Sequence, residues 1–481
     1  MGAQGGGRDQ PPGPGRGDDR ARGQHPARHP DRRDDRAGRG SQPVGAPGSG
    51  GVRNRVARRD ARWCPGERPF PQAGVSAAIG PVPLGVPRRT TCRACPAGDA
   101  PTSNVECVVP GHVLIAPDKF KGSLTAPGVA EAVADGMRRV RADVDVQVAP
   151  VADGGDGTVS AAIASGYRRV PVRVTGPVGE PVDAEIAVDG DTAVVELASA
   201  SGLAMLDPAR LAPMTATSAG TGELVRAALD EGAHTIVLGV GGSACTDGGA
   251  GMLGALGARL LAADGSPLPP GGGALAELDK LDLGDLDPRL NSAEVVLASD
   301  VDNPLLGPKG AAHVYGPQKG ADPAQVEQLD AALARWAHAV SSAGCGDVSG
   351  HPGAGAAGGV GFAAIAVLGA RRRPGTDVVL DLVGFDRRLA GARLVVTGEG
   401  SLDEQTLHGK APAGVASRAS TAGVPVVAVA GRCLLPAQRL HDAGFAAAYA
   451  LADVEPDPER SMREGAELLV GVGERIAREW L

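Results

Sequence analysis

The feature that most constrains the fold is a series of short apolar runs, rich in β-branched residues, that recurs from about residue 112 onward. Within each run the apolar residues are unbroken, whereas a strand with one solvated face would alternate apolar and polar residues. The pattern therefore predicts strands that are buried on both faces of a sheet. The runs occupy residues 113–116, 144–149, 235–240, 294–298, 393–397 and 425–430.

Segments with helical periodicity lie between these runs. In residues 127–140 the apolar side chains recur at helical spacing, and Pro127 suits the first turn of a helix. Residues 323–342 and 460–480 are also predicted helices. Because strand and helix alternate along the chain, we expect an α/β fold with a mostly parallel sheet.

The section 168–198 has a different pattern. Three strand-like segments follow one another, joined by turn signals at Gly176-Pro177 and Asp189-Gly190, and no helix separates them. This indicates a second, mixed-sheet unit inserted into the first. We expect residues 111–175 and 295–481 to form one α/β domain and residues 176–294 to form the inserted domain, with approximate boundaries.

The first 110 residues are predicted to lie outside both domains. They are rich in Gly, Pro, Arg and Asp and show no apolar period, so they cannot bury enough surface to offset chain entropy. Our hypothesis is that residues 1–110 are a disordered extension or a start-site artefact. No segment has the length and hydropathy of a membrane span, and we expect no membrane partner.

Charge is distributed unevenly. Residues 1–110 carry 18 arginines against 10 acidic residues, and the whole chain has a net charge of −8, so the remainder is strongly acidic. An acidic body argues against nucleic-acid binding. The seven cysteines are scattered without a zinc-ligand pattern in the regular part of the chain, and a reduced, cytoplasmic setting is the expected compartment.

Polar motifs directly follow five of the apolar strands. In open parallel sheets ligands bind outside the carboxyl ends of the strands, so these five loops are expected to converge on one cleft. The motifs are DKFKGS (118–123), ADGGDGT (152–158), GGSACTDGG (241–249), SDVDN (299–303) and GEGSLDEQ (398–405).

The residue types in these loops favour phosphoryl transfer. Gly241 and Gly242 free the backbone to turn its N–H groups toward an anion, and Ser243 adds a hydroxyl. Carboxylates are the hard ligands that Mg²⁺ uses together with nucleotide phosphates, or one of them could accept a proton from a substrate hydroxyl. The candidate carboxylates are Asp118, Asp153, Asp156, Asp300 and Asp302.

Lysine adds a second signal. Only six lysines occur among 48 basic Lys and Arg residues, and most of them lie in Asp- and Gly-rich stretches. A compact ammonium charge suits phosphate binding. His408, next to Lys410, could contact a phosphate or a carboxylate, or it could be a plain surface histidine.

Two familiar nucleotide sites are disfavoured. The chain has no GxxxxGK[ST] sequence, which excludes a Walker-type loop. Residues 353–358 (GAGAAG) match GxGxxG, but the preceding residues 345–352 do not form a strand pattern. We therefore interpret this segment as the glycine-rich start of a closely packed helix, and an NAD-dependent dehydrogenase remains a weaker alternative.

Taken in order, the motifs resemble those of the type I glycerate kinase family. They include VLIAPDKFKGSLTAPGVAEAV, VADGGDGTV, GVGGSACTDGGAGML, SDVDNPLLGPKGAA, YGPQKGA and VTGEGSLDEQTLHGKAPAGVA, and they span roughly residues 112–481. The sequence departs from the family pattern at Asp156, where Glu is common, at Cys245-Thr246, where Thr-Asn is common, and at Ser401, where Arg is common. The last change puts a phosphate role for position 401 in doubt.

The resemblance implies an ATP-dependent kinase that phosphorylates D-glycerate, usually at the 2-hydroxyl. It also implies two α/β domains, one flavodoxin- or Rossmann-like and one inserted, with the active site in the cleft between them. ATP and Mg²⁺ are the implied cofactors, and a monomer or homodimer is expected. The alternative from another class is a non-catalytic sensor of sugar acids or phosphate on the same fold.

From the motifs and the resemblance together we assign candidate roles. The expected catalytic residues are Asp118, Lys121, Asp153, Asp300 and Lys410. The expected metal ligands are Asp153, Asp156, Asp300 and Asp302. The expected substrate- or nucleotide-binding residues are Lys119, Ser123, Gly241, Gly242, Ser243, Asp247, Asn303, Lys319, Glu399, Asp403, Gln405 and His408.

Overall fold

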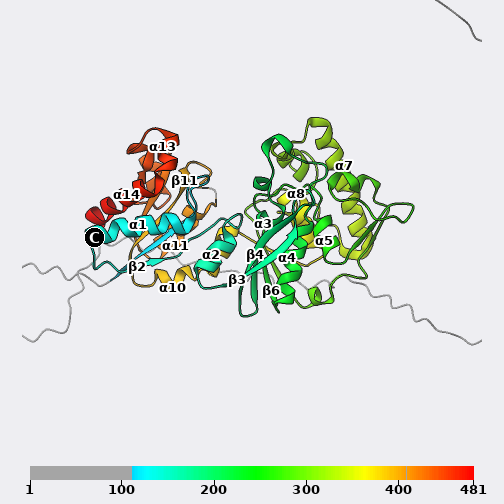
Figure 1. Cartoon of the computed structure of the whole chain (residues 1–481), viewed down its shortest axis with the longest axis horizontal. Helices are drawn as coiled ribbons and strands as arrows, with labels where there is room; N and C mark the ends of the chain where they lie inside the picture. The colour runs from blue at the N-terminus through cyan, green and yellow to red at the C-terminus, as the bar shows by residue number, and fades with distance from the viewer. Residues whose placement is uncertain (1–110, 408) are drawn as a thin grey trace, which may run out of the picture. The chain divides into compact units, whose positions relative to one another are not determined.

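The computed structural model describes residues 111–407 and 409–481 (Figure 1). The extension 1–110 and His408 lie outside the described residues. Within them, each apolar run singled out above contains or forms a strand, and the segment 168–198 forms three consecutive strands without a helix between them. The α/β prediction is confirmed.

Five strands form an entirely parallel sheet in the order β13-β12-β11-β1-β2. When its strands are renumbered along the chain, this order is 2-1-3-4-5 read from the β2 edge, which is the flavodoxin-like arrangement. A long insertion separates its second strand from its third. The strands are β1 (His112–Pro117), β2 (Val146–Val148), β11 (Ala392–Leu402), β12 (Val426–Cys433) and β13 (Ala447–Ala450).

Both faces of this sheet are covered, which explains the unbroken apolar strands. In β1, Val113 and Ile115 pack on one face with helices α1 (Ala126–Val140) and α14 (Gly465–Trp480). The alternate residues Leu114 and Ala116 pack on the other face with α9 (Gly375–Leu382), α10 (Phe385–Leu389) and α11 (Ala411–Thr421). Every side chain of β1 is therefore buried, and no position needs to be polar.

The second sheet is mixed and has six strands in the order β10-β9-β6-β5-β4-β3. The pairs β10-β9, β9-β6 and β6-β5 are parallel, and β5-β4 and β4-β3 are antiparallel. Its strands are β3 (Arg168–Thr175), β4 (Pro181–Asp189), β5 (Thr192–Glu196), β6 (Thr235–Gly239), β9 (Glu294–Ala298) and β10 (Arg371–Arg373). The expected mixed-sheet unit is thus present.

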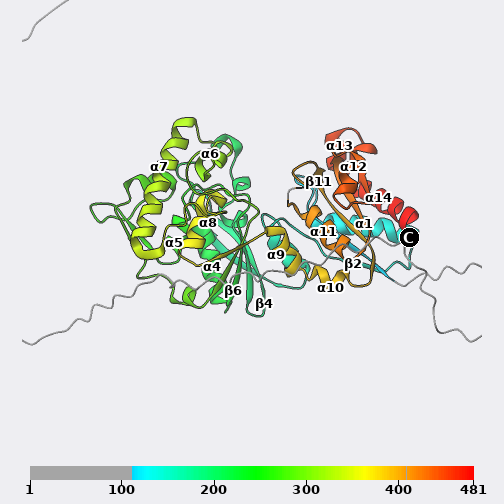
Figure 2. The ribbon, with the colours of Figure 1, turned by 180° about the vertical axis from the view of Figure 1, so that it is seen from behind.

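One face of the mixed sheet packs against the largest apolar cluster of the chain. That cluster includes side chains of α4 (Ala219–Asp230), α5 (Ala250–Ala255), α7 (Pro323–Val340) and α8 (Ala356–Ala366). Helix α7 begins at a capping box in which Asp322 and Gln325 bond reciprocally. In Figures 1 and 2 these helices gather around the strands of the mixed sheet.

The other face of the mixed sheet is covered by α2 (Thr158–Ala164) and α9, and these two helices also serve the first sheet. Val159 of α2 and Val378 of α9 pack on the mixed sheet with Val237. Ala161 of α2 and Val379 of α9 belong to the core of the five-stranded sheet. Two short helices therefore contribute to both apolar cores.

Other elements complete the described chain. Strands β7 (Arg259–Leu261) and β8 (Lys280–Asp282) pair as a small antiparallel ribbon. The remaining α-helices are α3 (Ala198–Ser201), α6 (Ala311–Tyr315), α12 (Ala437–Asp442) and α13 (Pro458–Arg463). No helix of the described residues combines the length and the apolar character that a bilayer crossing requires.

The strands are grouped differently from the division predicted from sequence. Hydrogen bonding places residues 168–175 and 294–298 in the six-stranded sheet, whereas the predicted division grouped residues 111–175 and 295–481 together. Buried parallel strands have the same apolar pattern in either sheet, so the pattern does not tell them apart. The boundaries of folding domains stay a prediction.

Helices α1 and α14 lie side by side, although they come from opposite ends of the described chain (Figures 1 and 2). Two glycines allow their close approach. A Cβ atom on Gly136 would lie 2.0 Å from the carbonyl oxygen of Val470, and one on Gly473 would lie 2.3 Å from the carbonyl oxygen of Val133. The backbones of the two helices therefore touch.

We expect Gly136→Ala to destabilise the protein by roughly 1–3 kcal/mol, because the added methyl group must push the helices apart. Gly471→Ala is the matched control on α14, since a Cβ atom there meets nothing within 4 Å. It should stabilise by about 0.5–1 kcal/mol through helix propensity. Chemical denaturation of both variants measures the difference, and equal stabilities would contradict the proposed packing constraint.

Candidate functional site

A pocket of about 630 Å³ lies at the carboxyl ends of the five parallel strands. Strand β1 is flanked by β2 and β11, and the chain order reverses direction at this point of the sheet. Ligands of open α/β sheets bind at such a switch point. The predicted site residues that line the pocket are Asp118, Lys119, Lys121, Ser123, Asp153, Asp156, Gly241, Gly242, Glu399 and Lys410.

Four of the five predicted loops therefore meet. They follow β1, β2 and β11 of the five-stranded sheet and β6 of the mixed sheet. The fifth loop, residues 299–303 after β9, does not line the pocket. It contributes to the site indirectly, through the hydrogen bond of Asp300 that is described below.

Glycines let the loop after β2 contact two other backbones. Gly154 has φ +84°, and a Cβ atom on it would lie 2.6 Å from the Cα atom of Gly375. A Cβ atom on Gly241 would lie 2.6 Å from the Cα atom of Gly155. Any larger residue at these contacts would separate the loop that carries Asp153 from its neighbours.

Glu196 fixes the other end of this loop, and sequence reasoning missed it. It is buried at the end of β5, and its Oε2 atom accepts hydrogen bonds from the backbone N–H groups of Gly157 (3.1 Å) and Val159 (3.2 Å). Burial raises the pKa of Glu196 to about 7, although the two N–H donors act in the opposite direction. An acidic residue ending the apolar run TAVVE was the available signal.

Asp118 is the most perturbed carboxylate of the pocket. It is only 9% exposed, and burial raises its pKa to about 7. The neighbouring Lys119 charge lowers this pKa, while Asp153 and Glu399 raise it further. The backbone N–H of Lys119 donates to Asp118 Oδ1 at 2.6 Å. A carboxyl group of this kind can accept a proton near neutral pH.

The two lysines after β1 have different environments. Lys119 pairs with Asp156, with 3.3 Å between Nζ and Oδ2, and also donates to the Asp156 carbonyl oxygen. Burial lowers the pKa of Lys119, but the charges of Asp118, Asp156 and Asp153 outweigh it and the net pKa is raised. Lys121 is exposed at the pocket and forms no ion pair within residues 111–407 and 409–481. Lys121 is therefore free to meet a ligand.

The side chains of Glu399 and Lys410 lie close together in the lining of the pocket. Their Oε2 and Nζ atoms are 3.4 Å apart, and Lys410 Nζ is 3.8 Å from Asp403 Oδ1. Glu399 is 8% exposed, and its Oε1 atom has no hydrogen-bond partner among the described residues. Burial raises the pKa of Glu399, and the Thr406 hydroxyl and the Lys410 charge oppose that shift. A buried acceptor without a partner next to a pocket is suited to a ligand hydroxyl.

The loop after β9 is occupied with internal contacts. Asp300 Oδ1 accepts from the backbone N–H of Gly375 at 2.9 Å, at the start of α9. Asp300 is an exposed residue, but partial burial of its carboxylate raises its pKa to about 6, with Asp153 contributing. Asp302 pairs with Arg372 at 2.5 Å. Asn303 donates to the Lys309 carbonyl oxygen and accepts from the Tyr315 hydroxyl, both at 2.8 Å.

Three more predicted ligand-binding residues do not line the pocket and bind other protein groups instead. Lys319 is 2% exposed, and its Nζ atom donates to Ser243 Oγ (2.9 Å) and to the Cys245 carbonyl oxygen (2.6 Å). Burial lowers the pKa of Lys319. Asp247 is fully buried and accepts from the Ser218 hydroxyl at 2.8 Å and from the backbone N–H groups of Gly249 and Gly251. These residues hold the glycine loop in place from inside.

The end of β11 shows how position 401 differs from the family pattern. Ser401 lines the pocket, and Arg432 Nε donates to its hydroxyl at 3.1 Å. A guanidinium group thus lies beside the position where arginine is common. Asp403 accepts from the backbone N–H of Gln405 (2.9 Å), which places Gln405 on an exposed turn. Ser123 lines the pocket and donates to the Met462 carbonyl oxygen at 2.7 Å.

The carboxylates do not form a metal cage by themselves. Across the described residues, no group of three or more His, Cys, Asp or Glu side chains is placed to hold a metal ion. Mg²⁺ in kinases is bound by one or two carboxylates together with substrate phosphates. Asp153 and Asp156 line the pocket and fit a cation of that kind, with Asp156 also paired to Lys119, whereas Asp302 does not line the pocket and is engaged by Arg372.

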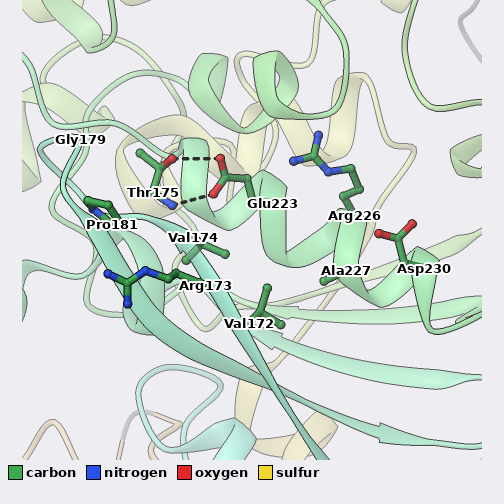
Figure 3. A pocket seen from close by; sticks show the side chains of 10 residues that line it. All are labelled: Val172, Arg173, Val174, Thr175, Gly179, Pro181, Glu223, Arg226, Ala227 and Asp230. Atoms are coloured by element: carbon green, nitrogen blue, oxygen red, sulfur yellow. Dashed lines mark hydrogen bonds between the residues drawn. The ribbon is translucent and has the colours of Figure 1, made fainter.

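A second pocket, of about 420 Å³, lies between β3 and α4 (Figure 3). Its polar side chains are engaged by other groups of the protein. Glu223 accepts from the backbone N–H of Thr175 at 2.6 Å and from its hydroxyl at 2.9 Å, and Arg226 donates to the Ala255 carbonyl oxygen. This pocket offers no cluster of free cations and carboxylates for phosphoryl transfer.

Comparison with known proteins matches this arrangement to one family. The model of the glycerate kinase family matches residues 113–481. The chain belongs to the glycerate kinase family. It is 44% identical over 369 residues to a glycerate kinase of Halalkalibacterium halodurans, covering 76% of this chain and 97% of that protein. It is also 44% identical over 343 residues to the glycerate 2-kinase of Escherichia coli K12, covering 70% and 90% of the two chains.

A solved structure supports the same fold. A crystal structure from Salmonella typhimurium LT2, described as that of a candidate glycerate kinase 2, superposes with a TM-score of 0.67 and 42% sequence identity. The similarity covers 77% of this chain and 98% of that one. The resemblance inferred from the motifs is confirmed.

In this glycerate kinase family chain, the GAGAAG segment packs internally. It does not follow a strand, and its last residues begin α8, where Ala357, Gly358 and Gly359 have positive φ. A Cβ atom on Gly358 would lie 2.1 Å from the Cys245 carbonyl oxygen. The interpretation as a closely packed helix start is confirmed, and the strand–turn–helix context of a dinucleotide fingerprint is missing.

The raised pKa of Asp118 predicts a stability effect with a definite sign. Its pKa is about 7 in the folded chain against an ordinary value of 3.8, so ionisation disfavours the folded state. The favourable contribution of the protonated group is complete at acid pH and is lost as pH rises through 7. Asp118→Asn should therefore stabilise the protein at pH 8, by an upper limit of about 4 kcal/mol, and by less at pH 5.

Chemical denaturation at both pH values measures this effect. The exposed Asp143→Asn variant is the control and should change stability little at either pH. An Asp118→Asn protein that is less stable than wild type at pH 8 would contradict the assigned burial cost.

Proposed function

We propose that this chain is an ATP-dependent kinase that phosphorylates D-glycerate at its 2-hydroxyl and releases 2-phosphoglycerate and ADP. The observation that carries the proposal is the meeting of carboxylates and lysines at the switch point of the parallel sheet. The match to the glycerate kinase family over residues 113–481 supports the substrate.

The reaction needs charge neutralisation and positioning more than covalent chemistry. Lys121 and Lys410 are the two pocket lysines suited to neutralise phosphate oxygens or the glycerate carboxylate. Lys121 has no ion pair among the described residues, and Lys410 lies 3.4 Å from Glu399, which a ligand anion could replace as its partner. Lys119, bound to Asp156, orients the loop after β2.

Asp118 is the proposed general base. With a pKa of about 7 it is ionised often enough to act at neutral pH and basic enough to accept a hydroxyl proton. In the proposed step the proton of the glycerate 2-hydroxyl passes to Asp118, the hydroxyl oxygen forms a bond to the γ-phosphorus of ATP, and ADP leaves. Glu399 Oε1, a buried acceptor without a partner in the described chain, would orient a ligand hydroxyl.

Mg²⁺ would be held by Asp153 and Asp156 and would supply charge neutralisation at the phosphates. The Gly241–Gly242 turn, which lines the pocket, would direct backbone N–H groups toward an anionic group. Asp300, Ser243, Asp247 and Lys319 act in this proposal as positioning residues, because their polar atoms bind the protein itself.

The wider assignments are also proposals. The five-stranded sheet and the mixed sheet would correspond to the two family domains, with the pocket lined from both. We place the reaction in the cytoplasm, where ATP is available. A monomer or homodimer stays a prediction.

An ADP-release assay with D-glycerate, ATP and Mg²⁺ tests the proposed function. Turnover should depend on glycerate, and kcat/KM should fall below about pH 7 as Asp118 becomes protonated. Phosphorus NMR should identify 2-phosphoglycerate as the product. Ligand binding without turnover would favour the sensor alternative, and 3-phosphoglycerate would correct the position.

Lys121→Ala should lower kcat/KM about a hundredfold, because one charged transition-state contact contributes roughly 3 kcal/mol. Its exposure makes a folding defect unexpected. Lys280→Ala, in the exposed start of β8, is the matched lysine control and should leave activity unchanged. Near-normal activity of Lys121→Ala would refute the assigned role.

A further inference from the structure

The pocket extends well beyond its charged groups. At its far end the pocket is lined by the uncharged residues Leu451, Ala452, Pro456, Pro458 and Met462. Ser461 and Glu455 lie among them, and the Glu455 carboxylate pairs with Arg460 at 3.1 Å. Met462 is 50% exposed. This end is mainly apolar and its one carboxylate is engaged by Arg460, whereas the lysines line the rest of the pocket, so the two ends differ in the chemistry that they can bind.

The order of the strands arranges these two ends along a line. Leu451 and Ala452 follow β13, Arg432 lies near the end of β12, Glu399 near the end of β11, Asp118 follows β1, and Asp153 follows β2. Met462, on α13, packs back against the loop after β1, because Ser123 donates to its carbonyl oxygen at 2.7 Å. The sheet order is β13-β12-β11-β1-β2. Because neighbouring strands lie about 4.8 Å apart, the four steps span roughly 19 Å. The pocket is therefore elongated across the strand ends, as an extended nucleoside triphosphate is.

Arg432 lies between the apolar end and the lysines. It is exposed and lines the pocket, and its Nε atom is held by the Ser401 hydroxyl at 3.1 Å. It forms no ion pair with a carboxylate of the described residues. An oriented guanidinium without an anionic partner is suited to bind phosphate oxygens.

We propose that ATP lies across the ends of the five-stranded sheet, with its base against Leu451, Ala452 and Met462 and its first phosphates beside Arg432. The triphosphate then runs over β11 toward Lys121 and Lys410, and its γ-phosphate reaches the Asp118 end. Glycerate takes the remaining end, between Asp153 and the Gly241–Gly242 turn. This assignment rests on the proposed function, since it orients the nucleotide of that reaction.

The chemistry of the two ligands excludes the opposite orientation. Glycerate is small and carries a carboxylate and two hydroxyl groups, so an apolar wall would contribute little to its binding and would desolvate its polar groups. A nucleotide base has flat apolar faces that gain from such a wall. The base end is also tied to the phosphate end, because Ser123 after β1 donates to the Met462 carbonyl oxygen at 2.7 Å.

The base contact is tested by Met462→Ala in the full chain, using calorimetric titration with ADP and with inorganic tripolyphosphate, both in the presence of Mg²⁺. The variant should weaken ADP binding about fivefold or more, through lost apolar contact, and should leave tripolyphosphate binding unchanged. Val454→Ala is the control, because Val454 is 62% exposed and does not line the pocket. Wild-type ADP affinity in Met462→Ala overturns the base assignment.

The phosphate contact is tested by Arg432→Ser, which should weaken ADP and tripolyphosphate alike, about tenfold. The double variant Ser401→Arg with Arg432→Ser moves the guanidinium group across the 3.1 Å contact and should recover most of the loss. Arg371→Ser, in an exposed pair with Glu294, is the arginine control. Unchanged tripolyphosphate binding in Arg432→Ser overturns this part of the assignment.

Steady-state kinetics separate this inference from the proposed function. Both pocket variants should raise KM for ATP and leave KM for D-glycerate unchanged, and an equal rise in both values overturns the orientation. If the variants change ADP binding as expected but the wild-type protein does not phosphorylate D-glycerate, the nucleotide site is supported and the proposed substrate is refuted.

Discussion

The site depends on close backbone contact around the loop after β2. Gly154 and Gly155 let this loop touch the backbones of Gly375 and Gly241 at distances that no side chain would permit. Those contacts bring a loop of the five-stranded sheet against the start of α9 and against the loop after β6. The carboxylate of Asp153, the glycine turn and the Asp300 carboxylate that caps α9 are thereby held near one another. The acidic and glycine motifs depend on each other for their positions, because their backbones are in contact.

Around this contact the protein buries several carboxylates whose negative charges repel one another. Asp118 and Glu399 both have raised pKa values, mainly through burial, and Lys119 and Lys410 compensate only in part. Such an arrangement costs stability and leaves binding capacity for cations and hydroxyl groups. Among the described residues, Glu399 Oε1 has no hydrogen-bond partner and Lys121 forms no ion pair, so both groups are available to a ligand. The pocket residues leave charge and hydrogen-bonding capacity uncompensated, and a bound ligand supplies the missing partners.

The sequence predicted the strands and most of the site loops because each depends on local pattern. Unbroken runs such as 113–116 signal burial on both faces, and polar motifs at strand ends signal a binding edge. The sheet to which residues 294–298 belong was not predictable, since a buried parallel strand has the same pattern in either sheet. Lys319 and Asp247 have the residue types of ligand-binding groups, but they bind the protein interior, a distinction that only burial and partners reveal. Arg432 and Met462 belong to no motif, and only the folded strand order brings them into the pocket.

The pairing of β1 with β11 has a consequence for how the protein is made. Strand β1 ends at Pro117, and its hydrogen-bonded neighbour β11 begins at Ala392. During synthesis β1 must therefore wait, without that partner, until the whole mixed sheet has left the ribosome. Asp118 and Glu399 then come together only near the end of translation. The pocket lacks Glu399, Lys410 and Arg432 until then, and the inserted segment has time to fold before the first sheet closes.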